Sequence, residues 1–339
     1  MDWSMDWQTL TLIWTGICAF AVIMYVLMDG FDLGLGILFP FAPTDRDRDI
    51  MMNSVAPIWD FNETWLILGG AGLFAAFPLA YSVALPAFYL PLLVMLVALV
   101  FRGVAFEFRF KARSSRHLWD KSFNIGSLVA TFSQGVVLGA FVSGIEVEGR
   151  DYAGGSFDWL SPFSILCGVA LVAGYGLLGA TWLIWRSQDD LQDWARAMAK
   201  RLLIAVLVFV LVVSIWTPLV NSEIRARWFD WPNIALLSPV PVVTALVAFW
   251  HWRSVETRRE VLPFVLTMVL FVLSFLGLAI SLWPNVIPPD ITIWEAASPP
   301  ESQVFLLVGM VFLIPTILAY TVYSYYVFRG KIQPEGFYH

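Results

Sequence analysis

Residues 28–36 read MDGFDLGLG and lie inside an apolar run that extends from Leu10 to Ala42. As one helix, this run would be about 50 Å long at ~1.5 Å per residue, whereas the hydrocarbon core of a bilayer is ~30 Å thick. Asp29 and Asp32 are three residues apart and therefore share one helix face. A carboxyl group inside a membrane usually takes a proton, forms a pair or faces water. The stretch predicts either two buried functional acids or a span that ends near Met28 and leaves both acids at the cytoplasmic headgroups.

The same stretch predicts close packing against a second helix. Gly30 and Gly34 are four residues apart, and this small-xxx-small spacing lets another backbone approach closely. We therefore expect the first span to contact a neighbouring helix through its glycines.

The composition of the whole chain is that of a membrane protein. Of its 339 residues, 59% are hydrophobic and 14% are charged, and the mean hydropathy is +0.74. A soluble domain carries roughly 25% charged residues, so this deficit favours lipid as the solvent. The chain has no basic stripe interleaved with aromatic residues, and we expect no nucleic-acid partner.

Nine apolar segments approach the roughly 20 residues that cross a bilayer. They predict an all-α integral membrane protein in which residues 1–339 form a single polytopic domain. The expected spans are Leu10–Ala42, Ile50–Phe77, Val83–Phe106, Phe123–Val142, Leu160–Trp185, Leu202–Val220, Ile234–His251, Val261–Trp283 and Val304–Phe328.

The loop charges predict the orientation. With nine spans and the N-terminus outside, 17 of the 20 Lys and Arg residues fall on the inner side, and the outer loops hold Arg150, Arg225 and Arg227. Cytoplasmic loops are enriched in Lys and Arg. We therefore expect the N-terminus outside and the C-terminus in the cytoplasm.

A second polar constellation begins the second predicted span, where residues 57–66 read PIWDFNETWL. Asp60 and Glu63 share a helix face, and Asn62 and Thr64 add polar groups within one turn. An acid followed three residues later by Glu also resembles an N-terminal capping box. Capping needs only one of these polar groups, so we favour a functional polar cluster.

The remaining candidates for a functional site are Arg102, Glu107 and the three histidines. Arg102, which is followed by Glu107, either snorkels to the inner headgroups or pairs with one of the acids above. The three histidines are His117, His251 and His339. None lies deep in a predicted span, as a bis-His haem would require, and we expect this chain to bind no cofactor or metal.

Both constellations resemble subunit II of the cytochrome bd-type quinol oxidases. Residues 28–36 resemble the signature of the family's first helix, and residues 57–66 resemble its segment Pro-x-Trp-Asp-Gly-Asn-Glu-x-Trp-Leu, with Phe61 in place of the glycine. Residues 74–78 and 101–109 also match, and the latter read FRGVAFEFR, closest to the cyanide-insensitive branch. The likeness is specific in the N-terminal third and mainly topological beyond it.

The resemblance implies a fold and an activity. The fold would be two four-helix bundles plus a peripheral helix, in a pseudosymmetric heterodimer with a haem-bearing subunit I. That partner would carry the quinol site, two b-type haems and haem d, and a small accessory subunit and membrane lipids could join the complex. The complex would sit in the bacterial cytoplasmic membrane, oxidise quinol, reduce O2 to water and build a proton motive force without pumping.

The resemblance also implies roles for individual residues. Asp60 matches the family's aspartate on a proton path at the subunit interface, and Asp29 and Asp32 match the acids of the first helix. We expect Asp60 to be buried and to relay protons towards subunit I. Glu63 is a further candidate for the proton path, and the supporting polar network would include Trp59, Arg102 and Glu107.

A different class of function remains open from the residues alone. A secondary transporter could use the buried carboxylates for ion coupling. An odd number of spans does not divide into two equal inverted halves, which favours the oxidase subunit. A transporter would move its substrate alone, whereas an oxidase subunit needs its partner.

Overall fold

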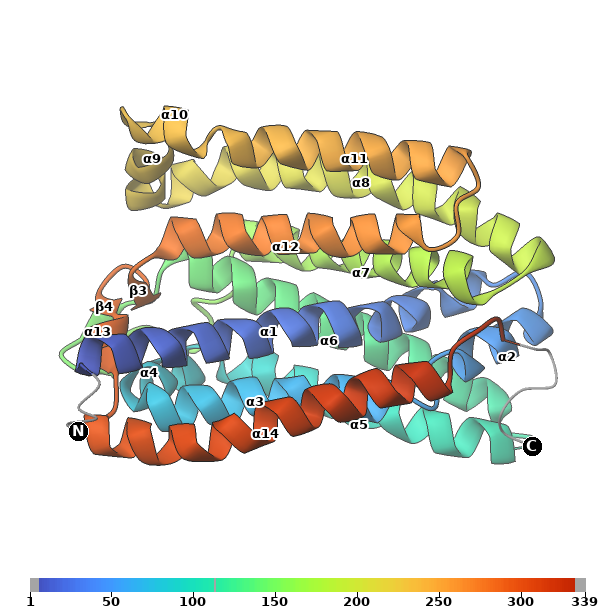
Figure 1. The fold of residues 1–339 in the computed structure, drawn as a ribbon, viewed down its shortest axis with the longest axis horizontal. Coiled ribbons are helices and arrows are strands. Elements are labelled where there is room, and N and C mark those ends of the chain that lie inside the picture. The colour runs from blue at the N-terminus through green and yellow to red at the C-terminus, as the bar shows by residue number, and fades with distance from the viewer. Residues whose placement is uncertain (1–5, 113, 333–339) are drawn as a thin grey trace.

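The computed structural model describes residues 6–112 and 114–332, and this part of the chain is almost entirely helical (Figure 1). His339 lies outside the described residues. The prediction of an all-α membrane protein is confirmed. The longer helices are α1 (Trp7–Leu38), α3 (Trp59–Ala76), α5 (Tyr89–Lys111), α6 (Arg116–Ser143), α7 (Pro162–Arg186), α8 (Asp189–Val220), α11 (Pro239–Glu256), α12 (Leu262–Leu282) and α14 (Pro300–Val327).

Short elements connect the long helices. Two small antiparallel hairpins, β1–β2 and β3–β4, precede α7 and α13. The short elements are η1 (Phe39–Phe41), α2 (Asp45–Asn53), α4 (Pro78–Ala87), β1 (Val147–Glu148), β2 (Asp151–Tyr152), α9 (Ser222–Phe229), α10 (Asn233–Leu237), β3 (Asn285–Ile287), β4 (Ile291–Thr292) and α13 (Ile293–Ala296).

Eight helical segments of the described chain are long and apolar enough to cross a membrane, one fewer than expected. The difference lies in the predicted span Ile50–Phe77. There α2 ends at Asn53, a turn follows, and α3 starts only at Trp59. The first turns of α3 carry Asp60, Asn62 and Glu63, so this 18-residue helix is less apolar than the other eight.

Other predicted boundaries are wrong as well. The third span was expected from Val83, but the chain breaks at Phe88 between α4 and α5, next to the prolines Pro86 and Pro91. Proline lacks the backbone N–H that continues a helix. The sixth span was expected from Leu202, but α8 begins at Asp189, because the amphipathic segment before the apolar run is also helical.

The long helices pack as two groups of four with α14 alongside (Figure 1). Helices α1, α3, α5 and α6 form the first group, and α7, α8, α11 and α12 form the second. Helix α7 joins the groups, because it packs on both α1 and α6. Helix α14 lies along α1 and α3 and presents most of its surface outward. This arrangement places the C-terminal half of α1 at the centre of the molecule.

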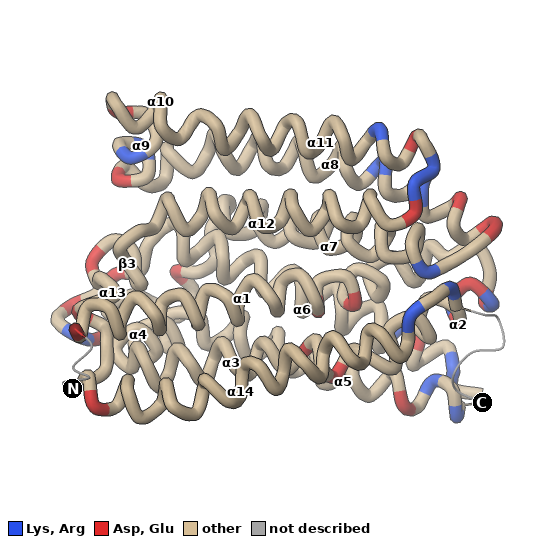
Figure 2. Tube along the Cα trace, in the orientation of Figure 1, with Lys and Arg blue, Asp and Glu red and all other residues tan. Residues whose placement is uncertain are grey.

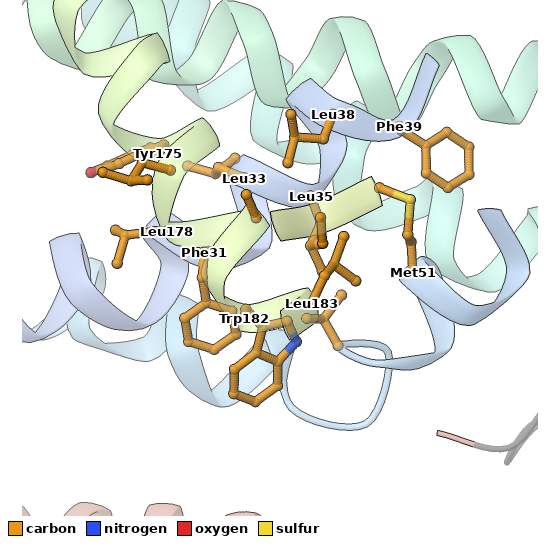
Figure 3. Packing of buried hydrophobic residues seen from close by; sticks show 14 of the residues in the cluster. Phe31, Leu33, Leu35, Leu38, Phe39, Met51, Tyr175, Leu178, Trp182 and Leu183 are labelled. Atoms are coloured by element: carbon orange, nitrogen blue, oxygen red, sulfur yellow. The ribbon is translucent and has the colours of Figure 1, made fainter. Parts of the chain in front are cut away.

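A large cluster of buried hydrophobic residues fills the contact between α1 and α7 (Figure 3). Leu33 and Leu35 are wholly buried there, and the ring of Phe31 stacks on Trp182 at 4.3 Å between centroids. Burying an aromatic or aliphatic side chain of this size contributes on the order of 1.5–3 kcal/mol in water, and in a bilayer dispersion contacts carry much of this packing. The two aspartates of α1 therefore sit in a tightly packed apolar setting.

Candidate functional site

Helix α1 carries both of its aspartates into the interior. Asp29 and Asp32 are each 0% exposed, and the helix continues to Leu38. The alternative in which the span ends near Met28 and both acids meet the headgroups is therefore wrong. The structure supports the reading in which two carboxyl groups lie inside the membrane.

The glycines of α1 explain how this helix can be central. A Cβ built on Gly34 would overlap the carbonyl oxygen of Tyr175, and one built on Gly179 would lie 2.6 Å from the carbonyl carbon of Gly34. The backbones of α1 and α7 therefore touch at this crossing. A Cβ on Gly30 would lie 3.0 Å from the side chains of Tyr175 and Leu178. The close approach predicted from the spacing of the two glycines is confirmed, and α7 is the neighbour.

Arg102 of α5 supplies the positive charge of the site. Its side chain is 0% exposed, its Nη1 donates to Asp29 Oδ1 at 2.7 Å, and its Nη2 lies 3.3 Å from Glu63 Oε2. The expected alternative, a side chain that snorkels to the headgroups, is wrong, because two carboxylates hold the guanidinium inside the bundle. Arg102 therefore pairs with acids of α1 and α3, as the other alternative expected.

Asn62 and Tyr325 complete the surroundings of Asp32. Asn62 Nδ2 donates to Asp32 Oδ2 at 2.8 Å, and the hydroxyl of Tyr325 donates to Asn62 Oδ1 at 2.9 Å. Asn62 is fully buried, and Tyr325 reaches it from α14. Residues from α14, α3 and α1 thus form one chain of hydrogen bonds that ends at the Asp32 carboxyl group.

The cluster contains more acids than cations. Three carboxyl groups, those of Asp29, Asp32 and Glu63, surround the single guanidinium of Arg102. Asp29 and Glu63 contact that cation, whereas the described residues offer Asp32 an amide. A buried carboxylate without a cation is costly. A proton on Asp32 would remove this uncompensated charge. Its Oδ1 has no hydrogen-bond partner among the described residues.

Trp59 covers the arginine. The Arg102 guanidinium lies 5.7 Å from the centre of the Trp59 ring, which is the geometry of a cation–π contact. The indole stacks on the ring of Phe106, with 5.1 Å between the ring centroids. Gly103 has no side chain and therefore leaves room for the indole. The expected supporting role of Trp59 agrees with this placement.

Asp60 lies elsewhere than expected. Its side chain is exposed on the first turn of α3, and its carboxylate makes no hydrogen bond or ion pair with the described residues. The expectation that Asp60 is buried is therefore wrong for this chain taken alone. The capping-box alternative is also wrong, because the N-cap residue of α3 is Ile58 and it forms no side-chain cap. Phe61, in place of the family's glycine, turns edge-on to Tyr320 at 4.6 Å and leaves Asp60 uncovered.

Glu107 was expected in the supporting network, and the structure places it outside. Its side chain is 63% exposed and pairs with Lys111 one turn further along α5, at 3.5 Å. It is five residues beyond Arg102, so the two side chains leave the helix in different directions.

Sequence reasoning missed a second set of polar contacts beside the acids. Gln134 of α6 donates from Nε2 to the hydroxyl of Tyr25 at 2.8 Å and accepts at Oε1 from the hydroxyl of Tyr175 at 2.9 Å. These contacts tie α1, α6 and α7 together one turn of α1 before Asp29. A glutamine inside an apolar run is a visible signal, but neither tyrosine stands out from the other aromatic residues of the chain.

An ionic cluster links the C-terminal end of α5 and the N-terminal end of α6 to α2. Arg109 is 1% exposed, and it pairs with Asp49 of α2 at 2.7 Å and with Asp120 of α6. Arg116 pairs with Asp49 as well. Because three elements meet at these charges, the cluster fixes the C-terminal end of α5 against the N-terminal end of α6.

The described residues do not fit a haem with two histidine ligands. His117 is exposed on the first turn of α6, and the buried His251 of α11 already contacts Thr267 Oγ1 through Nε2 at 2.9 Å. Within the described part of the chain, His, Cys, Asp and Glu form no group of three that could hold a metal ion.

The chain is similar to known proteins over most of its length. Residues 10–328 match the family model described as cytochrome bd terminal oxidase subunit II. The chain is 29% identical to the cytochrome bd-I ubiquinol oxidase subunit 2 of Escherichia coli K12, over 97% of each chain, and 28% identical to the cytochrome bd ubiquinol oxidase subunit 2 of Bacillus subtilis 168, over 95% of this chain and 96% of the relative. Its fold is similar to a chain of the bd oxidase from Geobacillus thermodenitrificans, with a TM-score of 0.74 at 18% identity, over 95% of this chain and all of that one.

Proposed function

The chain belongs to the cytochrome bd terminal oxidase subunit II family, and from this premise we propose that it carries protons to a haem-bearing partner through its buried acids. The family is that of a respiratory quinol:oxygen oxidoreductase, a haem-containing complex of several membrane subunits. The chain is therefore a multi-pass membrane subunit of a terminal oxidase, and the transporter alternative is set aside.

The division of labour between the subunits is part of the proposal. Subunit I holds two b-type haems, haem d and the quinol site, and the present chain holds no haem. The supporting observation is the state of the two described histidines, one exposed and one engaged with Thr267. The chain's part in the reaction then concerns protons and assembly.

The proposed route runs along one face of α3 into the bundle. Asp60 is the exposed acid, and Glu63, one turn further along, has 23% of its side chain exposed and lies against Arg102. Arg102 and Asp29 form the buried neutral pair, and Asp32 is the acid beyond it that has no cation. Asp60 would exchange protons with subunit I at the subunit interface, and Asp32 would hold a proton in the interior.

The observation that carries the proposal is the excess of buried carboxyl groups. A cluster built only for stability would pair each acid or replace it with an apolar side chain, since buried ionic groups seldom add stability. Ionisable residues inside a membrane generally mark ion or proton pathways. Here an unpaired buried acid and an exposed acid lie within two adjoining helices, α1 and α3.

The test is oxygen consumption by the purified complex carrying Asp60→Asn or Asp32→Asn. Each variant should keep the wild-type haem content. Its quinol-dependent rate of oxygen consumption should fall at least about ten-fold, since proton transfer by positioned side chains raises rates by about 10²–10⁴-fold. Asp190→Asn, an exposed acid on the first turn of α8, is the matched control. Wild-type activity in both Asp60→Asn and Asp32→Asn would refute the proton route.

The proposed orientation rests on charge. Lys and Arg gather at the end of the molecule that carries α2, with few at the opposite end near α9 (Figure 2). Inner loops of bacterial membrane proteins are enriched in these residues. The end with α2 would then face the cytoplasm, with the N-terminus outside.

A further inference from the structure

The hydrogen bonds around Asp32 form a chain with a defined direction. The hydroxyl of Tyr325 donates to Asn62 Oδ1 at 2.9 Å, and Asn62 Nδ2 donates to Asp32 Oδ2 at 2.8 Å. Both donors point towards the carboxyl group. In this arrangement Asp32 is an acceptor, as an ionised carboxylate must be.

The same three groups also support the opposite direction. An amide has an acceptor oxygen and a donor NH2 group, and a tyrosine hydroxyl can both donate and accept. If the Asn62 amide turns over, Oδ1 can accept a proton-bearing oxygen of Asp32, and Nδ2 can donate to the Tyr325 oxygen. The Asn62 oxygen and NH2 group that face Asp32 and Tyr325 keep a partner in either direction, so the amide carries no cost of an unmade buried hydrogen bond in either protonation state of Asp32.

We propose that Tyr325 is a positioning residue for Asp32: with Asn62 it forms a reversible hydrogen-bond relay that accommodates Asp32 both with and without its proton. The inference rests on the proposed role of Asp32 as a proton carrier. Phenylalanine at position 325 would fill nearly the same space but could neither donate to Asn62 nor accept from it.

The surroundings of Asp32 contain few competing groups. Asp29 lies on the same face of α1 and is held by Arg102 of α5, and Glu63 of α3 contacts that same guanidinium. From α14 the titratable group at this site is the hydroxyl of Tyr325. The charged neighbours are thus paired with one another, and the amide is the polar partner of Asp32 among the described residues.

The inner end of α14 is fixed, and this holds Tyr325 in place. Arg186 of α7 donates from Nη2 to the carbonyl oxygen of Phe328, and the backbone N–H of Ile332 donates to the carbonyl oxygen of Arg186 at 2.9 Å. One turn before Tyr325, Thr321 is buried, and Tyr320 meets Phe61 of α3. Tyr325 therefore reaches Asn62 from a helix held on both sides of it.

The experiment is infrared difference spectroscopy of the complete oxidase between acidic and alkaline pH, together with the pH profile of oxygen consumption. The Asp32→Asn variant identifies the carboxyl C=O band of Asp32 by its loss. Tyr325→Phe should shift that band and reduce turnover by about three- to ten-fold, the effect of one buried hydrogen bond. Tyr323→Phe, on an exposed tyrosine of the same helix, is the matched control and should change neither.

A double-variant cycle separates the relay from general packing. If Tyr325 acts through Asn62, then adding Tyr325→Phe to Asn62→Leu should leave the band and the pH profile where Asn62→Leu alone puts them. Additive effects, or a Tyr325→Phe complex with the wild-type band and pH profile, would overturn the relay. An Asp32→Asn complex of wild-type activity that loses no carboxyl band would instead overturn the proposed role of Asp32.

Discussion

Arg102 shows how a single buried charge organises the residues around it. It neutralises Asp29, contacts Glu63 and lies under the ring of Trp59. The guanidinium of an arginine suits this position better than the ammonium of a lysine. It is planar, so it can bind a carboxylate through each of its two terminal nitrogens and stack on an aromatic ring. Asp32 is left with the amide of Asn62, and this difference between two acids three residues apart gives them different chemistry.

The pair of Arg102 and Asp29 should be fragile when only one partner is removed. Arg102→Met leaves the Asp29 carboxylate buried without its cation, which costs on the order of 3–5 kcal/mol. We expect a clear loss of thermal stability and yield of the purified complex, measured by a detergent melting assay. Adding Asp29→Asn should recover part of the loss, because the uncompensated charge disappears.

The matched control for this pair is Arg150→Met, since Arg150 is exposed on the turn between β1 and β2. It should leave the melting temperature within error of the wild type. An Arg102→Met complex as stable as this control would show that the pair does not stabilise the fold.

At the scale of the element, α1 combines two requirements that seldom occur in one helix. It must be apolar enough to cross the bilayer and polar enough to hold two acids. Its glycines make this possible, because at Gly34 the backbone of α7 comes close enough to exclude lipid from the acids one turn away. The helix therefore lies inside the protein along the half that carries the acids, and its N-terminal half is more exposed.

The crossing of α1 and α7 should tolerate no side chain at Gly34. Gly34→Ala places a methyl group onto the carbonyl of Tyr175, so the helices must separate, and overpacking of this kind costs about 1–3 kcal/mol. We expect less assembled oxidase and a lower melting temperature. Gly16→Ala on the same helix meets nothing within 4 Å and serves as the control. Equal stability of the two variants would contradict the close crossing.

At the scale of the whole molecule, the long helices differ in how much of their surface is buried. Helices α8 and α11 of the second group are mostly exposed, whereas α6 and α7 are largely buried. The cluster of Asp29, Asp32, Glu63 and Arg102 lies in the first group, next to α14 and to the exposed Asp60. The side of the molecule formed by α3 and α14 is therefore where a proton could pass between the chain and a partner.

The orientation can be measured on the whole chain by single-cysteine labelling. In a background with Cys18 and Cys167 replaced by alanine, a membrane-impermeant maleimide added to spheroplasts should label a Ser156→Cys variant, whose exposed site precedes α7. It should not label a Ser114→Cys variant until the membrane is permeabilised. Position 114 is exposed between α5 and α6. Charge asymmetry between the two ends is the physical reason, and the reverse pattern would refute the proposed orientation.

The sequence by itself determined the class of protein and most of its helices. Hydrophobic length is a local property, so most spans could be read from single segments, and the spacing of Asp29, Asp32 and the glycines gave one helix face directly. The predicted helix boundaries were wrong where a segment combines apolar residues with polar residues or prolines. The polar start of α3, the break at Phe88 and the amphipathic beginning of α8 depend on neighbours that a single segment does not show.

Only the tertiary structure decided which acid receives a cation. The contact of Arg102 with Asp29 joins residues 73 apart, and that of Tyr325 with Asn62 joins residues 263 apart. Such pairs depend on how helices cross and rotate against one another, which backbone contacts such as that of α1 with α7 fix. For the same reason Asp60 and Glu107, both polar and both within matching segments, turned out to lie on the surface. The burial of an ionisable side chain is a property of the packed bundle, and local sequence sets only which side chains are available to it.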